Sequence, residues 1–209
     1  FAYEITDGDG DTSAATVTLD LGQAPPPPDS EPALVDGPGV IALEEGEIAD
    51  TDATSFTVDF GDDAPGSAVL SAAGLDGQLT SNGEAVTFSV ESGTLVGRAG
   101  GEIVLTADLS DLGGEGGEGG EGGGTYTVNA TLEGPVDHGE AGADTVILRD
   151  VAVLIADADG DTLTVNLDIA LGDDVPAAAD DAGASSEYGA AVSGSVLDND
   201  EAGADGLAS

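Results

Sequence analysis

The chain has 209 residues, of which 43 are Asp or Glu and only two are Lys or Arg, so its formal net charge is −41. This balance excludes nucleic acid as a partner, because phosphate binding requires clustered basic side chains, and it argues against docking on anionic membranes. No apolar stretch approaches the roughly 20 residues that span a bilayer, so no membrane insertion is expected. Repulsion among the carboxylates opposes a compact fold unless cations bind. Because there is no cysteine, metal is the expected substitute for disulfides.

Hydrophobic residues make up 40% of the chain, below the roughly 45–50% that is typical of globular domains. Two alternatives follow, a disordered acidic spacer and a folded chain with a thin core. The apolar residues lie in short alternating runs, which favours folded β-structure. Aromatic residues are only 3%, so we expect a core of Val, Leu, Ile and Ala.

The first segment, residues 1–22, is predicted to be the finishing strand of a preceding repeat, with Val17, Leu19 and Leu21 on one face. Four consecutive prolines then predict a semi-rigid polyproline linker over residues 23–29. The chain begins at Phe1, with no methionine and no signal peptide. We therefore expect an internal fragment of a longer protein.

Residues 30–176 are predicted to form one complete antiparallel, Ig-like β-sandwich. Many short alternating runs are separated by turn residues, without helical periodicity, and the clearest of them is Leu163–Leu171. Within this unit, the glycine- and glutamate-rich residues 113–124 predict a flexible loop between two strands. Residues 177–186 are expected to be a linker. Residues 187–209 are expected to begin another module, with a strand over 191–197.

Two nearly identical acidic turns, Asp7–Thr12 and Asp157–Thr162, are spaced by 150 residues. Each is followed by an alternating run that ends in glycine at the same spacing, which indicates a tandem repeat. Three carboxylates on alternate residues, with a glycine that permits positive φ, suit the six to eight oxygen ligands of Ca²⁺ better than Mg²⁺. A plain polar hairpin turn is the alternative. The predicted Ca²⁺ ligands are Asp7, Asp9, Asp11, Asp157, Asp159 and Asp161.

Four more carboxylates lie at the junction after the sandwich and in the next module, namely Asp173, Asp174, Asp198 and Asp200. We expect them to bind Ca²⁺ between modules, and a solvated acidic linker is an equal alternative. His138 is the one histidine, which is weak evidence for zinc, and we expect Asp137 to hold it or the ring to cap a loop. The arginines, Arg98 and Arg149, are expected to pair with local carboxylates. No serine has the context of a catalytic nucleophile.

Several segments in order resemble the large tandem repeats of type I secreted bacterial adhesins, the giant RTX-type surface proteins. The resemblance covers roughly residues 30–176, and residues 192–200 resemble the opening of cadherin-like or VCBS-type modules. The segments that carry it are Leu75–Gly83, Gly124–Val128, Pro135–His138, Ala156–Thr162 and Gly172–Pro176.

This resemblance implies secreted, extracellular β-sandwich units that are stiffened by calcium and hold a terminal binding domain away from the cell. The partners it implies are Ca²⁺, neighbouring repeats of the same chain, and a host or surface ligand bound by other domains. The glycine–aspartate nonapeptides that direct type I secretion are absent from this sequence. The leading hypothesis is a non-catalytic extender. The alternative is a carbohydrate- or protein-binding module, and the shortage of aromatic residues speaks against sugar stacking.

Overall fold

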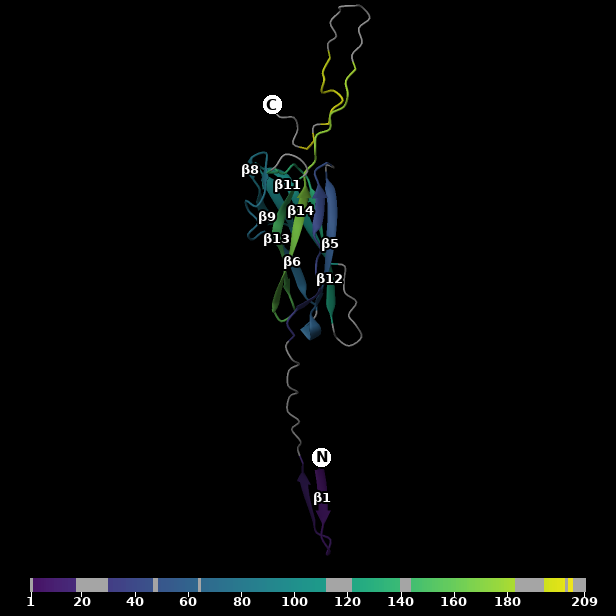
Figure 1. Ribbon diagram of the computed structural model, residues 1–209. Helices are drawn as coiled ribbons and strands as arrows, with labels where there is room; N and C mark the ends of the chain where they lie inside the picture. The colour runs from purple at the N-terminus through teal and green to yellow at the C-terminus, as the bar shows by residue number, and fades with distance from the viewer. Residues whose placement is uncertain are drawn as a thin grey trace, which may run out of the picture.

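The structure is a computed structural model that describes residues 2–17, 30–46, 49–63, 65–111, 122–139, 144–182, 194–201 and 203–204. Over these residues the chain is all-β, which confirms the predicted fold class (Figure 1). One short 3₁₀ turn, η1 (Gly61–Asp63), interrupts the strands, and no α-helix occurs in the described ranges. The described residues contain no helix that is long and apolar enough to cross a membrane.

Two sheets form the sandwich. The larger has the strand order β3-β5-β12-β11-β10-β9, and the smaller has the order β4-β14-β13-β6. The larger sheet comprises β3 (Ala33–Asp36), β5 (Asp50–Asp59), β9 (Thr87–Glu91), β10 (Thr94–Ala99), β11 (Glu102–Asp111) and β12 (Gly123–Leu132). The smaller sheet comprises β4 (Ile41–Glu44), β6 (Ser67–Ser71), β13 (Thr145–Ala156) and β14 (Thr162–Gly172).

Neighbouring strands of both sheets are antiparallel with one exception, since β4 runs parallel to β14. Ile41 pairs with Ile169, and the register continues to Glu44 opposite Gly172. The prediction of an antiparallel sandwich is therefore wrong at this edge. The reason is topological, because a strand near the start of the unit and its last strand run toward the same end of the sandwich.

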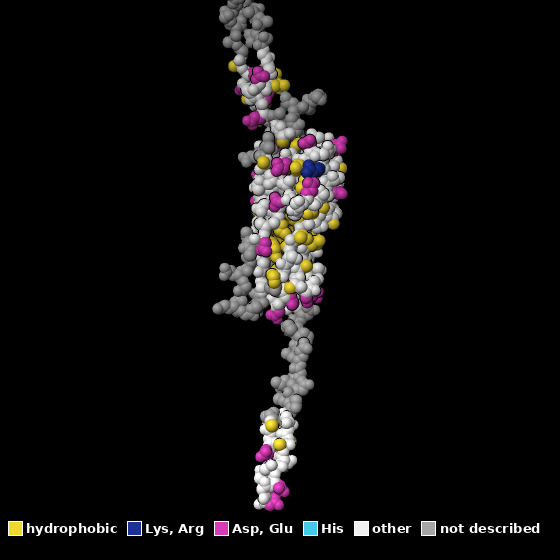
Figure 2. All heavy atoms as spheres, turned by 180° about the vertical axis from the view of Figure 1, so that it is seen from behind, with side chains coloured by type: hydrophobic (Ala, Val, Ile, Leu, Met, Phe, Trp, Pro, Cys, Tyr) yellow, Lys and Arg dark blue, Asp and Glu magenta, His cyan; other side chains and the backbone are white. Residues whose placement is uncertain are grey.

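The core lies between the two sheets and is mainly aliphatic, as expected. In β12 every second side chain is buried, and β14 alternates over most of its length. Four of the described aromatic residues, Phe56, Phe60, Phe88 and Tyr126, belong to this core. The rings of Phe56 and Tyr126 stack with centroids 5.5 Å apart across the β5–β12 pair. Acidic side chains are scattered over the outer face shown in Figure 2, with hydrophobic atoms visible between them. The alternating pattern thus separates a thin core from a strongly acidic surface.

The free edge of β4 is covered by side chains of β5. Backbone N–H groups on alternate residues of an edge strand point away from its sheet partner and need other acceptors. Carboxylate and hydroxyl oxygens at alternate positions of β5 supply them and join the two sheets. The bonds are Gly39 N to Thr54 Oγ1 (2.7 Å), Ala42 N to Asp52 Oδ2 (2.9 Å) and Glu44 N to Asp50 Oδ2 (2.7 Å).

The N-terminal segment is a hairpin rather than a single finishing strand. β1 (Ala2–Thr6) and β2 (Thr12–Thr16) pair around the first acidic turn, with Thr6 opposite Thr12. Val17 lies just after β2, while Leu19, Leu21 and the polyproline linker lie outside the described residues. A second small hairpin, β7 (Thr80–Ser81) with β8 (Glu84–Ala85), belongs to the sandwich unit.

Two boundary predictions need correction. Gly123 and Gly124 pair with β5 as the first residues of β12, so the glycine-rich connection ends before residue 123. Residues 112–121 lie outside the described part. The strand expected over 191–197 is not found in its described residues 194–197. Instead, Glu201 forms an isolated antiparallel bridge with Ala177.

The chain enters and leaves the sandwich at opposite ends of β14. At the entry, the backbone N–H of Ser30 donates to Asp63 Oδ2 at 3.1 Å. The carbonyl of Asp63 accepts the N–H of Ala158, in the turn that precedes β14, at 3.0 Å. β14 then runs for 11 residues to Gly172, where the chain leaves. At about 3.3 Å per residue, the strand separates the two ends by roughly 35 Å.

Candidate metal centres

The acidic turn between β13 and β14 is organised by its first aspartate. Asp157 Oδ1 accepts the backbone N–H groups of Gly160 at 2.9 Å and Asp161 at 2.8 Å. In return, the N–H of Asp157 donates to the Asp161 carbonyl oxygen at 3.1 Å, which closes the turn. Gly160 has a φ of +109°, a conformation that residues with a side chain rarely adopt. The glycine of the motif is therefore required by the backbone.

The turn between β1 and β2 repeats this geometry. Asp7 Oδ1 accepts the N–H groups of Gly10 at 3.1 Å and Asp11 at 2.9 Å, and the Asp7 N–H donates to the Asp11 carbonyl at 3.0 Å. Gly10 has a φ of +100°. The 150-residue repeat seen in the sequence thus extends to individual hydrogen bonds.

Both turns bring three carboxylates together. In each of them, one oxygen from each aspartate lies within 4.8 Å of the others, so either group could hold a metal ion. This is the convergence that the alternating aspartates predict. The two groups are Asp7, Asp9 and Asp11, and Asp157, Asp159 and Asp161.

The two turns differ in burial. Asp157 is only 8% exposed, and its Oδ2 atom is buried without a hydrogen-bond partner among the described residues. Asp7 is exposed. The difference arises because η1 lies against the second turn through the bond from Ala158 to the Asp63 carbonyl. Asp157 Oδ2 has lost its contact with water without gaining a hydrogen-bond donor, and such burial is unfavourable. A bound cation would remove this cost.

The electrostatics of each turn favour the ionised form of its first aspartate. Burial raises the pKa of Asp157, but interaction with the Asp159 side chain and hydrogen bonds from the amides of Gly160, Asp161 and Asp159 outweigh it and leave the pKa lowered. The pKa of Asp7 is lowered by its interaction with the Asp9 side chain and by the Asp11 amide. Ionised carboxylates are the form that binds a cation.

No candidate metal group of the described residues contains more than one of the four predicted junction ligands. Asp173 joins a different cluster, described below. Asp174 Oδ2 accepts the N–H of Ala204 at 2.9 Å, and Asp200 Oδ1 accepts the N–H of Ala179 at 2.8 Å. Asp198 is in none of the candidate metal groups of the described residues. These bonds connect Asp200 and Ala204 to the segment that leaves the sandwich.

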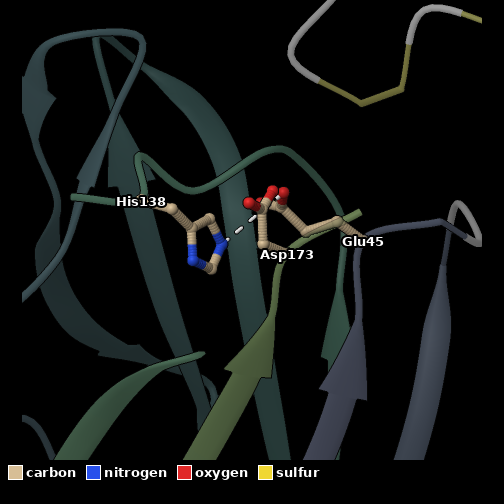
Figure 3. A group of neighbouring side chains, drawn as sticks. All are labelled: Glu45, His138 and Asp173. Carbon is tan, nitrogen blue, oxygen red and sulfur yellow. Dashed lines mark ion pairs between the residues drawn. The ribbon is translucent and has the colours of Figure 1, made fainter. Parts of the chain in front are cut away.

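Glu45, His138 and Asp173 form a third group, which the sequence did not reveal (Figure 3). The expectation that Asp137 holds His138 is wrong, since Asp137 Oδ2 accepts the N–H of Gly83 at 2.8 Å. Glu45 faces the imidazole instead, with Oε2 at 3.6 Å from Nε2. No spacing rule joins these residues, because they come from three separate strand ends.

Both arginines pair with local carboxylates, as predicted. Arg98 lies 3.4 Å from Glu91, and Arg149 lies 3.5 Å from Asp168. The Arg98 guanidinium lowers the pKa of Glu91. These pairs are partly exposed, so each adds little to stability.

Comparisons of the chain with models of protein families, with curated proteins and with solved structures gave no match.

Proposed function

We propose that this chain contains a calcium-stiffened, non-catalytic extender unit of a large secreted bacterial surface adhesin. In this role the unit lies outside the cell, binds Ca²⁺, adjoins neighbouring repeats, and holds a distal ligand-binding domain away from the surface. The bacterial and secretory part of the proposal comes from the sequence resemblance. The structural and calcium parts are supported by the geometry that follows.

The observation that carries the proposal is the repeated acidic turn. Two copies make the same hydrogen bonds, and each gathers three carboxylates on alternate residues. A hairpin needs only the Asp-Gly pair to turn, whereas the two further aspartates repel one another. A hard cation with six to eight oxygen ligands removes that repulsion and gives the buried Asp157 Oδ2 a partner, because this oxygen can coordinate the ion. Backbone carbonyls and water complete such a shell.

The path of the chain supports a role as a spacer under tension. Entry near the Asp157 turn and exit after Gly172 place the two connections at opposite ends of the sandwich. Because β4 is parallel to β14, a pull on both connections drives these strands past each other. Their ladder bonds then resist together instead of opening one at a time. A mechanical spacer benefits from this arrangement.

The test is thermal unfolding of the full chain in buffers of matched ionic strength that contain EDTA, Mg²⁺ or Ca²⁺. A single site that is filled at 100 times its dissociation constant stabilises by about 2.7 kcal/mol. For a domain of this size the expected rise in Tm is roughly 5–10 °C. Ca²⁺ should give this rise and Mg²⁺ much less. Equal melting curves in EDTA and Ca²⁺ would refute the calcium-stiffened extender.

A further inference from the structure

Three strand ends meet at the exit end of the sandwich (Figure 3). Glu45 directly follows β4, Asp173 directly follows β14, and His138 lies in the segment after β12. One ligand atom from each lies within 4.8 Å of the others. The side chains of His138 and Glu45 are 3% and 0% exposed. The group therefore combines one imidazole and two carboxylates in a protected position that links both sheets.

The imidazole of His138 is the informative member. Both of its ring nitrogens are buried, and neither has a hydrogen-bond partner among the described residues. The distance of 3.6 Å from Nε2 to Glu45 Oε2 is beyond a normal hydrogen bond. A buried polar nitrogen without a partner costs about 1–3 kcal/mol. The ring points at the two carboxylates, so a partner placed between them satisfies Nε2 (Figure 3).

We propose that Glu45, His138 and Asp173 form a second metal site, selective for a borderline divalent cation of the zinc class. Tetrahedral zinc with bonds of about 2.0–2.2 Å holds its ligand atoms about 3.3–3.6 Å apart. The Nε2–Oε2 distance already has this value. The other ligand atoms need to approach by no more than about 1.5 Å. Water fills the fourth position.

The donor set separates this site from the acidic turns. Calcium and magnesium take oxygen ligands almost exclusively, whereas imidazole suits zinc and its transition-metal neighbours. The turns at Asp7 and Asp157 offer only oxygen donors. The chain thus presents two kinds of site, and in the sandwich they lie at opposite ends of β14. The zinc-class site does not depend on the calcium proposal.

The surroundings hold the ligands in place. The Glu45 carboxylate accepts the N–H of Val136 through Oε1, which leaves Oε2 toward the imidazole. The Glu45 amide donates to the Gly172 carbonyl at 3.1 Å, and the Asp173 amide donates to the Asp144 carbonyl at 2.9 Å. Such outer contacts orient the ligands before the metal arrives. An ion here joins the ends of β4, β12 and β14 and so links the two sheets where the chain leaves.

The experiment uses the full chain without a polyhistidine tag, stripped of metal and then saturated with Ca²⁺ to fill the acidic turns. Zn²⁺ is titrated by calorimetry, and Co²⁺ is titrated as a visible-absorption probe of tetrahedral coordination. We expect one equivalent of Zn²⁺ to bind and an intense Co²⁺ spectrum to appear. His138→Gln should weaken binding by more than about 100-fold, since loss of outer-shell contacts alone already costs 10–100-fold. Asp159→Asn, in the acidic turn, is the matched control and should leave Zn²⁺ affinity unchanged.

Two further readouts guard against a variant that fails to fold. Asp173→Asn changes a partly exposed ligand and should also weaken Zn²⁺ binding while preserving the circular dichroism of the apo-protein. Because His138 is the only histidine, its ring NMR signals are unambiguous and should shift on addition of one equivalent of Zn²⁺. Unchanged ring signals, unweakened binding in His138→Gln, or no Zn²⁺ binding above saturating Ca²⁺ would each overturn the site. The last result would leave His138 and Glu45 as a buried pair of side chains without a metal ion.

Discussion

Asp157 and Asp161 are joined in both directions, because the Asp161 N–H donates to Asp157 Oδ1 at 2.8 Å and the Asp157 N–H donates to the Asp161 carbonyl at 3.1 Å. These two hydrogen bonds close the turn without a metal ion. The remaining aspartate, Asp159, is the exposed member of the group, and its side chain and backbone amide also interact with the Asp157 carboxylate. Removal of the Asp159 charge therefore distinguishes the destabilisation caused by repulsion among the carboxylates from the stabilisation caused by cation binding.

Asp159→Asn should change stability in opposite directions with and without calcium. In EDTA the variant should melt at or slightly above the wild-type temperature, because one repelling charge is gone and the new amide can donate to the Asp157 carboxylate. In Ca²⁺ it should melt several degrees lower, because a charged ligand is lost. Differential scanning calorimetry in the two buffers measures both signs.

The matched control for that experiment is Asp36→Asn. Asp36 is an exposed carboxylate on β3 that belongs to none of the metal groups of the described residues, so its removal changes net charge by the same amount. The Asp36→Asn control should change the melting temperature by the same amount in EDTA and in Ca²⁺. If Asp159→Asn also shifts both melting temperatures equally, the acidic turn contributes only general repulsion and the calcium assignment fails.

The carboxylate of Asp52 should give the edge contact between β4 and β5 a pH dependence. The pKa of Asp52 is lowered by the hydrogen bond from the Ala42 amide and then by that from Ala53. A group whose pKa is lowered by folding adds stability above its usual pKa of 3.8, and this is lost as pH falls through the folded value. Wild type should exceed Asp52→Asn in unfolding free energy near pH 6 by up to about 1 kcal/mol.

Chemical denaturation of both proteins between pH 6 and pH 3 tests this sign. The difference between them should narrow as the pH drops below about 4, while the relief of general repulsion affects both proteins alike and cancels. A difference that stays constant or widens on acidification would show that the charge of Asp52 does not support the edge.

The acidic turns and the strands were predictable from local sequence, whereas the third cluster was not. Alternating aspartates fix which carboxylates converge, and the period of two in Leu163–Leu171 fixes the buried face of β14. Glu45 and His138 meet only because β4 and β12 end at the same edge of the sandwich. That meeting depends on the parallel pairing of β4 with β14, which no local pattern specifies. The role of Asp52 on a neighbouring strand is equally non-local.

Gly97 in β10 should not tolerate a methyl group. A Cβ atom there would lie 2.7 Å from Cε1 of Phe88 and 3.1 Å from Cγ1 of Val86, both in the core. Overpacking of this kind costs about 1–3 kcal/mol, so Gly97→Ala should lower the free energy of unfolding by that amount. Urea denaturation measures it. Gly37→Ala, where the nearest atom would be 3.7 Å away, is the control and should change stability by less than about 0.5 kcal/mol.

A double variant checks the cause of the Gly97 effect. Phe88→Leu removes the ring that the new methyl meets, so Gly97→Ala should cost less in the Phe88→Leu background than in wild type. An unchanged cost would mean that the loss arises from contact with Val86 or from the backbone of β10, and not from contact with Phe88.

The parallel pair of β4 and β14 should make mechanical resistance depend on direction. The chain has no cysteine, so introduced cysteines are unique attachment points for single-molecule pulling. Handles at Ser30→Cys and Val175→Cys load the pair lengthwise, and the register from Ile41–Ile169 to Glu44–Gly172 must shear as one unit. Handles at Val40→Cys and Asp168→Cys lie beside the same end of both strands and peel the bonds apart in turn. With both proteins in Ca²⁺ buffer, we expect the lengthwise pull to need a clearly higher unfolding force than the pull from Val40 and Asp168. The reason is that several hydrogen bonds must break together in the lengthwise direction. Equal forces in the two directions would show that this edge is not what resists tension, and the extender would need another source of strength.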